Sequence, residues 1–329
     1  MKKVIAIVVT HNRHQLLVEC INGLRAQTQP LDQILVINNG SSDYTGVWLD
    51  KQEDLIHIYQ ENMGPAGGYH TGLKWAYENG YTWMWCMDDD GYPQENALEN
   101  LLINRGNELS LVNSLVVDKD NKQTLVYQPK NIQLVAEVNE SSIEGMCQLF
   151  NGTMFHRDIV EKAGLPQSAM CYCGGELEYY YRIVNRYQIS SKTIPQSIQY
   201  HPSTQYSNKK EWDCGASWKI YFHIRNRLKV FQSKYRLKSV AWVAYLFFIG
   251  GFLWSIIRHQ KKDKIRKMAF VFWPMHDGFS EKLDATPFII ETQMRKQSEK
   301  SVVHFVLSPL KRKLFNSLVV SHSEAAISI

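Results

Sequence analysis

Three consecutive aspartates, Asp88, Asp89 and Asp90, follow the apolar run "WMWCM" and precede a glycine. One explanation is a solvated turn, because Asp and Gly favour turns. The other is a divalent-cation site, because Mg²⁺ and Mn²⁺ take carboxylate oxygens as ligands together with substrate phosphates. Alternate side chains of an extended backbone point the same way, so Asp88 and Asp90 could share one ion while Asp89 points elsewhere.

The first hundred residues alternate between strand and helix patterns. The runs "KVIAIVVT", "QILVIN" and "LIHIYQ" predict buried strands, and "YTWMWCM" predicts a fourth strand. Apolar residues at helical spacing between 16 and 24, and the stretch from Gly64 to Gly80, predict helices between them. This order predicts an α/β fold with a parallel sheet and helices on both faces.

The carboxyl ends of such strands are where ligands bind. The four predicted strands end in "THNR", "NNGSSD", "ENMGPAGG" and "DDDG", all polar or rich in glycine. Any one of these segments is an ordinary turn. Four of them at one edge of a sheet predict the rim of a binding site, in which the glycines of "GPAGG" allow a loop to approach a ligand closely.

The pattern is more mixed beyond residue 109. "LVNSLVVD" and "MCQLFNGTMF" predict strands, "RDIVEKAG" predicts a short helix ended by Gly164, and a second helix begins near Glu176. "SKTIPQSIQYHP" is either a strand or a loop. A long helix-prone segment follows over residues 217–239.

Residues 240–257 carry no charge and lie between two basic clusters. Eighteen apolar positions are at the short limit for a membrane span. Basic residues on both sides favour a helical hairpin or an interfacial helix on an anionic inner leaflet, because a span shows positive charge on one side only. A buried core helix is the alternative.

Composition excludes several classes of protein. A net charge of +5 over 329 residues does not imply nucleic acid, and we expect no nucleic-acid partner. The sequence has no P-loop, no nucleophile elbow and no dinucleotide-binding fingerprint in the required context. The six cysteines show no zinc-site spacing, and the first residues lack a signal-peptide pattern. We therefore expect reduced thiols in a cytosolic protein.

Eight motifs in order resemble those of family 2 inverting glycosyltransferases with the GT-A fold. "VVTHNR", "VINNGSSD", "NMGPAGG" and "CMDDDG" are similar to the nucleotide-sugar domain of that family. "NGTMFHRDIVEKAGLP", "GGELEYYYR", "YHP" and "YFHIRNRL" resemble its bacterial galactofuranosyltransferase and rhamnosyltransferase subgroup. The resemblance covers about residues 3 to 285 and implies a Rossmann-like mixed sheet with helices on both faces.

The resemblance implies a metal site and a donor site. Asp88 and Asp90 match the acidic ends of the family's D-x-D motif, and His201 matches a histidine that completes its metal site, so the implied cofactor is Mn²⁺ or Mg²⁺. Asp89 lies where the family contacts the sugar or its ribose. The other implied nucleotide-sugar contacts are Thr10, Asn12, Asn39, Asp43 and Gly67.

The family also has a catalytic base, a carboxylate that takes the proton of the acceptor hydroxyl. Its D-D-x-E-like tetrad corresponds here to Gly175-Glu176-Leu177-Glu178, so the first acid is absent. The resemblance implies Glu176 as the base and Glu178 as a supporting or acceptor-binding carboxylate. Two helix N-terminal acids that favour the macrodipole are the alternative interpretation.

These observations predict a metal-dependent inverting glycosyltransferase. We expect it to move galactofuranose from UDP-galactofuranose onto a lipid-linked saccharide in O-antigen or capsule biosynthesis, at the cytoplasmic face of the bacterial inner membrane, as a peripheral protein. The alternatives are a dTDP-rhamnose-dependent rhamnosyltransferase and a catalytically inactive saccharide-binding or scaffold module. The expected organisation is a GT-A domain over 1–205, a helical, membrane-associating region over 206–285 and a tail over 286–329.

Overall fold

The computed structural model describes residues 3–127, 132–145, 148–203, 210–213, 217–283 and 285–298. The chain divides into two compact units. The first comprises Met1–Gln205 with Ser233–Arg236, and the second comprises Tyr206–Gln232 with Leu237–Ile329. Most of the tail expected over 286–329 lies outside the described residues.

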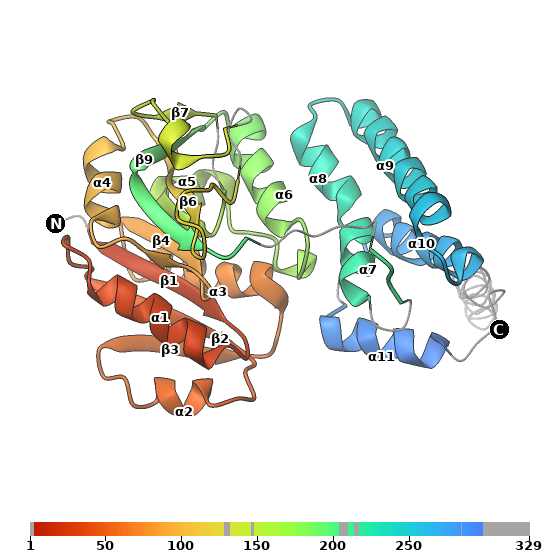
Figure 1. The fold of residues 1–329 in the computed structure, drawn as a ribbon, viewed down its shortest axis with the longest axis horizontal. Helices are drawn as coiled ribbons and strands as arrows, with labels where there is room; N and C mark the ends of the chain where they lie inside the picture. The colour runs from red at the N-terminus through yellow and green to blue at the C-terminus, as the bar shows by residue number, and fades with distance from the viewer. Residues whose placement is uncertain are drawn as a thin grey trace, which may run out of the picture. The chain divides into compact units, whose positions relative to one another are not determined.

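The described residues of the first unit form one nine-stranded sheet in the order β3-β2-β1-β4-β8-β6-β9-β5, with β7 paired to β9 (Figure 1). The strands β3, β2, β1 and β4 are parallel, as the sequence predicts. The sheet as a whole is mixed, because β8 runs antiparallel between β4 and β6. The strands are β1 Val4–Thr10, β2 Gln33–Asn39, β3 Leu55–Gln60, β4 Trp83–Asp88, β5 Tyr92–Pro93, β6 Ser110–Asp118, β7 Ile143–Glu144, β8 Asn151–His156 and β9 Ser190–His201.

Helices cover both faces of this sheet. One apolar cluster joins β1, β2 and β4 to α3, α5 and α6, and a second joins the opposite side of the same strands to α1, α2 and α4. Burial of both faces explains why β1 is apolar throughout its length. The helices are α1 His14–Arg25, α2 Thr45–Leu49, α3 Gly64–Glu78, α4 Ala97–Asn104, α5 Arg157–Ala163 and α6 Gly175–Tyr181, with a π-helical stretch over Arg182–Arg186.

Two predictions for these elements were wrong. The run "LIHIYQ" is not a buried strand, because β3 lies at the edge of the sheet and most of its residues are partly exposed. The segment "GPAGG" is not a loop but the beginning of α3. A Cβ at Gly68 would lie 2.4 Å from Cγ1 of Val9, so this glycine is what lets α3 pack closely on β1.

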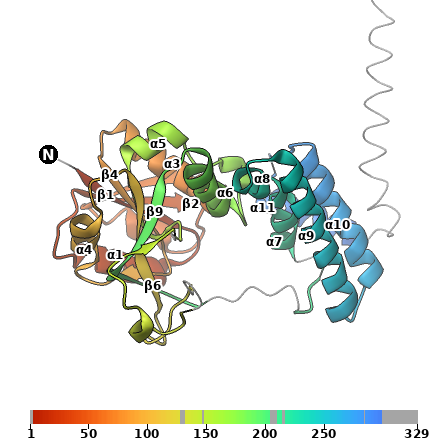
Figure 2. The same ribbon diagram turned by 90° about the horizontal axis from the view of Figure 1, so that it is seen from above.

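The second unit is helical in its described residues. Its helix α9 shows a buried stripe with a period near 3.6 residues, formed by Ala241, Tyr245, Ile249, Phe252 and Ile256. The helices α9 and α10 lie side by side in both views (Figures 1 and 2). The helices are α7 Trp218–Arg225, α8 Arg227–Lys234, α9 Lys238–His259, α10 Lys264–Phe279 and α11 Pro287–Ser298. The last two residues of α8, Ser233 and Lys234, belong to the first unit.

The motif "YxxxRN" lies inside the second unit. The hydroxyl of Tyr221 donates to Asp277 Oδ2 at 2.8 Å, and the buried Arg225 donates through Nε to Asn226 Oδ1 at 2.9 Å. Burial raises the pKa of Tyr221 above its ordinary value, and the charge of Asp277 raises it further. These residues are therefore part of the core of the helical unit.

Candidate active site

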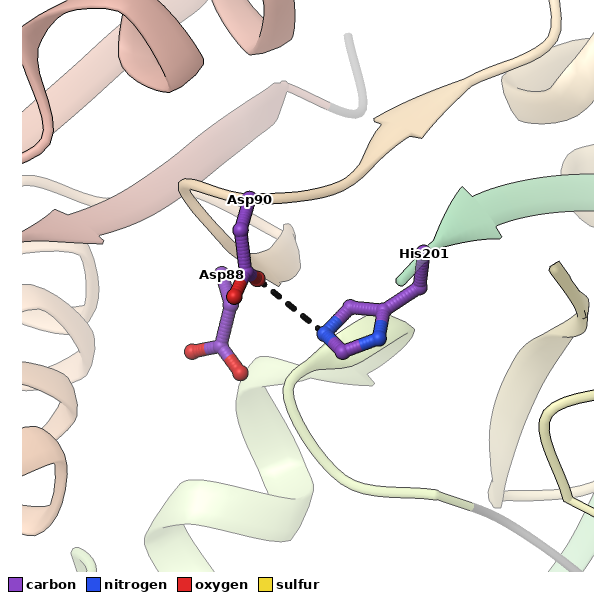
Figure 3. A group of neighbouring side chains, drawn as sticks. All are labelled: Asp88, Asp90 and His201. Carbon is purple, nitrogen blue, oxygen red and sulfur yellow. Dashed lines mark ion pairs between the residues drawn. The ribbon is translucent and has the colours of Figure 1, made fainter. Parts of the chain in front are cut away.

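Asp88, Asp90 and His201 form a group of three possible metal ligands. One ligand atom from each residue lies within 4.8 Å of the others. Figure 3 shows the imidazole directed at the Asp90 carboxylate, with Nε2 of His201 3.1 Å from Oδ1 of Asp90. Two carboxylates and one imidazole are a donor set that suits Mn²⁺ or Mg²⁺.

The sheet topology explains how a histidine 111 residues away reaches the aspartates. The segment left open as a strand or loop is the twelve-residue strand β9, which runs parallel to β6. His201 is its last residue, in register with Asp118 at the end of β6. Asp88 likewise ends β4, so the acids and the histidine meet at the carboxyl edge of one sheet.

One nitrogen of His201 is held by the backbone. Nδ1 lies 2.8 Å from the carbonyl oxygen of Pro202, which only accepts hydrogen bonds, so Nδ1 carries the proton. In the neutral ring this leaves the Nε2 lone pair directed at the acidic group. Burial lowers the pKa of His201, but the hydrogen bond with Asp90 and the charges of Asp90 and Asp88 outweigh it, so the pKa is raised.

A tyrosine of α3 positions the Asp88 side chain. The hydroxyl of Tyr69 donates to Oδ1 of Asp88 at 2.7 Å, and the Tyr69 ring stacks on Phe150 at a centroid distance of 3.7 Å. Burial raises the pKa of Asp88 to about 7, and the charge of Asp90 adds to the rise despite the Tyr69 hydrogen bond. A cation would therefore stabilise the charged form of this carboxyl.

Asp89 lies with Asp90 in the turn after β4 and is not one of the three possible metal ligands. Its carboxylate is buried and accepts from the hydroxyl of Thr10 at 2.7 Å and from a guanidinium nitrogen of Arg13 at 3.0 Å. The same Arg13 nitrogen donates to Asp90 at 2.8 Å. Asp89 and Thr10 therefore fix the end of β1 to the aspartate turn.

Asn12 and Asp43 join the loop after β1 to the loop after β2. Oδ1 of Asn12 accepts from the backbone nitrogen of Ser42 at 2.7 Å. Oδ2 of Asp43 accepts from the backbone nitrogen of His14 at 3.2 Å. Both side chains are exposed, so they remain accessible to a ligand at this edge.

Asn39 and Gly67 are buried, unlike Asn12 and Asp43. The Asn39 amide accepts from Met63 N at 3.2 Å and donates to the Gly64 carbonyl at 3.0 Å, which engages it with the segment before α3. A Cβ at Gly67 would lie 2.3 Å from the Cβ of Met63, within the first turn of the helix. Both residues therefore pack at the beginning of α3.

Glu176 is an exposed residue in the first turn of α6. Its charge and those of Asp88 and Asp90 act on the phenol of Tyr127, whose pKa rises to about 12, chiefly through burial. Glu176, Asp88 and Asp90 therefore all lie near enough to Tyr127 for their charges to act on its phenol.

Glu178 has surroundings different from those expected of an acceptor-binding carboxylate. It is 1% exposed, and its two oxygens accept from Nε and Nη2 of Arg182 at 3.1 and 3.2 Å. Its Oε1 also accepts from Gln167 at 3.3 Å and from Ser233 at 2.9 Å. Arg182 balances the charge of this buried carboxylate, and these contacts favour the supporting role, in which Glu178 holds α6 in place.

Three further residues belong to the site, and the sequence reasoning did not assign them. Arg13 stands in the quoted segment "THNR", and Tyr69 lies one turn into α3, so both had a positional signal. Tyr127 lies between β6 and β7 and had none, because a loop residue far from the motifs carries no periodic pattern.

Comparison with known proteins shows a similarity to one family of glycosyltransferases. Residues 5–164 match the model described as "Glycosyl transferase family 2". "Galactofuranosyltransferase GlfT1" of Mycobacterium tuberculosis (strain CDC 1551 / Oshkosh) is 28% identical over 197 residues, which cover 56% of this chain and 65% of that protein. The protein of the same description from Mycolicibacterium smegmatis (strain ATCC 700084 / mc(2)155) is 29% identical, over 55% and 65%. The chain thus spans less than two thirds of the length of these relatives.

Solved structures agree on the fold. The structure described as "S. aureus TarS 1-349 in complex with UDP" has a TM-score of 0.53 at 14% sequence identity, over 90% of this chain and 91% of that one. The longer TarS structure gives a TM-score of 0.54 at 12% identity, over 92% of this chain and 54% of that one. The predicted GT-A fold is confirmed.

Proposed function

We propose that this chain, which has the GT-A fold and resembles family 2 glycosyltransferases, belongs to that family and transfers galactofuranose from UDP-galactofuranose to a lipid-linked saccharide in O-antigen or capsule biosynthesis. The observation that carries the donor is the similarity to two galactofuranosyltransferases over 197 residues.

In this proposal the acidic edge of the sheet binds the donor. Asp88, Asp90 and His201 would hold Mn²⁺ or Mg²⁺, which would neutralise the charge that develops on the diphosphate leaving group. Arg13, whose side chain is 46% exposed beside Asp90, supplies a second positive charge at the same place. Asn12 and Asp43 contact the nucleoside from the exposed loops after β1 and β2.

The transfer is a single in-line displacement that inverts the anomeric carbon. The acceptor hydroxyl oxygen forms a bond to this carbon as the bond to the diphosphate oxygen breaks, and UDP leaves. Glu176 takes the proton of the hydroxyl, which is general-base catalysis. Glu178 and Arg182 position α6, and hence Glu176, through their buried ion pair.

The second unit docks on the anionic face of a membrane, which brings the enzyme to its lipid-linked acceptor. Of the described helices, α9 alone is long and apolar enough to cross a membrane, yet only 28% of its apolar window is buried, which disfavours a core helix. Between the residues of its buried stripe, α9 exposes large apolar side chains, and basic residues flank both ends of the helix. The most exposed are Leu246, Phe247 and Trp254. This pattern suits an interfacial helix.

Turnover of defined donors tests the enzymatic proposal. Purified protein with Mn²⁺ and a lipid-linked disaccharide acceptor should release UDP from UDP-galactofuranose faster than from UDP-galactopyranose or dTDP from dTDP-rhamnose. Faster turnover of dTDP-rhamnose would assign the rhamnosyltransferase activity instead. No nucleoside diphosphate release from any donor would favour an inactive binding module.

Liposome sedimentation tests the membrane proposal. Phe247→Glu places a charge on the exposed face of α9 and should reduce binding to anionic vesicles at least tenfold. Ile103→Glu, at a 70% exposed position of α4 in the first unit, is the matched control and should bind as the wild type does. Equal binding of both variants would contradict an interfacial role for α9.

A further inference from the structure

A groove of about 780 Å³ lies in the first unit, and none of the three metal-group residues lines it. Its walls come from the last turns of α1, from the segment between β5 and α4, and from Tyr200 of β9. The family assignment and the proposed transfer reaction leave this groove without a role.

The groove lies on the face of the sheet opposite to Asp88. Trp85 and Met87 of β4 pack with the α1 side, whereas Met84 and Cys86 pack with the α3 side. Continued alternation places Asp88 on the α3 side, where Tyr69 contacts it. Tyr200 and His201 are neighbours in β9 and their side chains point to opposite faces, so the groove and the metal group share a strand but not a space.

The walls combine aromatic rings with uncharged and acidic polar groups. The ring centroids of Tyr92 and Tyr200 lie 5.2 Å apart, with an angle of 42° between the ring planes. Nζ of Lys122 lies 4.7 Å from the centroid of the Tyr200 ring and helps to fix the position of that ring. Aromatic faces offer a surface for the apolar face of a sugar ring. The side chains of Asn22, Glu95 and Asn96 are exposed and offer donors and acceptors for hydroxyl groups. Glu19 and Thr28 complete the polar lining.

These walls are held rigidly by the backbone beneath them. The buried amide of Gln27 donates to the carbonyls of Gly23 at 2.9 Å and Gln94 at 2.8 Å, and it accepts from Leu98 N at 3.0 Å. The backbone nitrogen of Thr28 also donates to the Glu95 carbonyl at 2.8 Å. A preformed groove loses little entropy when it binds a ligand.

Charge and shape favour one class of ligand. Two acids, Glu19 and Glu95, line the groove, and no Lys or Arg is among its lining residues. The nearby lysines are engaged, Lys119 with Glu19 at 3.7 Å and Lys122 over the Tyr200 ring, so the groove disfavours phosphates and nucleotides. Only Ala26 and Pro93 add aliphatic surface, which is little for an apolar peptide. We propose that this groove is a second saccharide site, which binds an uncharged oligosaccharide independently of donor and metal.

Calorimetry on the full chain tests this proposal with two named probes, a linear hexasaccharide of galactofuranose and maltohexaose, in the presence of EDTA. At least one probe should bind saturably. Tyr92→Ala, which keeps the Cβ that packs on Gly23, and Asn22→Arg, on the exposed face of α1, should each weaken binding at least tenfold. Glu95→Gln should weaken it about threefold. Glu161→Gln, the same change at an exposed position of α5, should not.

The result is independent of the transfer reaction. His201→Ala should retain oligosaccharide binding whether or not the protein turns over UDP-galactofuranose, so a failed donor assignment leaves this test intact. Absence of saturable binding of both probes would overturn the proposal. Binding unchanged in Tyr92→Ala and Asn22→Arg, or displaced by UDP with Mn²⁺, would overturn it as well.

Discussion

The first unit has two pairs of carboxylates that look alike in sequence, Asp88 with Asp90 and Glu176 with Glu178. In the first pair, ligand atoms of both side chains lie within 4.8 Å of each other and of His201. In the second pair only Glu176 is exposed, because Glu178 is enclosed and bound by Arg182. Identical spacing therefore places both acids in the site in one case and only one in the other.

The difference follows from secondary structure. Asp88 ends β4 and Asp90 lies in the turn that follows, and this turn brings both carboxylates to one group with His201. Residues two apart in a helix are separated by about 200° and point to different sides. Glu176 and Glu178 lie in the first turn of α6, so the helix separates this pair into an exposed and a buried acid.

Removal of Asp90 should produce the largest effect. Asp90→Ala deletes a carboxylate that both His201 and Arg13 contact, and a metal-held diphosphate is worth several kcal/mol at the transition state, so turnover should fall ~10³-fold or more. Steady-state UDP release at saturating Mn²⁺ measures it. A loss below tenfold would remove Asp90 from the metal group.

Glu176→Gln should come next. The amide keeps the size of the side chain but accepts no proton, so kcat should fall ~10²–10⁴-fold while donor affinity stays unchanged. Measurement of kcat and of the dissociation constant of UDP in the same variant separates a loss of catalysis from a loss of donor binding. Retained kcat would show that another group takes the proton.

Glu178→Gln should act on stability, not on chemistry. Loss of the charge leaves Arg182 buried without its ion-pair partner, which should lower the free energy of unfolding by about 3 kcal/mol. Urea denaturation measures this, with Glu161→Gln as an exposed control expected within about 0.5 kcal/mol of wild type. A kcat loss equal to that of Glu176→Gln, at unchanged stability, would instead place Glu178 among the reacting groups.

Tyr69→Phe should have the smallest effect in this series. It removes the hydroxyl that donates to Asp88 but keeps the ring stacked on Phe150, so unfolding free energy should fall by about 1–2 kcal/mol. The apparent Kd for Mn²⁺ should rise about tenfold, because the ligand loses its orientation. Metal affinity identical to that of wild type would show that Tyr69 does not position Asp88.

Local patterns predicted much of this fold. Buried runs such as "KVIAIVVT" placed the parallel strands, and the polar residues after each strand located the ligand edge. The antiparallel β8 between β4 and β6 could not be predicted, because strand neighbours far apart in sequence leave no periodic signal. The exposure of β3 depends on its place at the sheet edge, which is equally non-local.

The site was predictable where a motif alone determines geometry. The sequence grouped Asp88 with Asp90 and set Asp89 apart, although Asp89 and Asp90 lie in the turn after β4 and not in the strand. The partners were not predictable in the same way, since Arg182 lies four residues after Glu178 and this spacing also suits an exposed surface pair. Burial decides between the two, and burial depends on the helices and loops that pack around α6.

We propose that Asp88, Asp90 and His201 bind the donor diphosphate through a divalent ion. Calorimetric titration of UDP into the full chain, with Mn²⁺ and then with EDTA, tests this binding. We expect UDP to bind only with Mn²⁺ and His201→Ala to weaken this binding at least tenfold. Equal affinity for UDP in Mn²⁺ and in EDTA would contradict it.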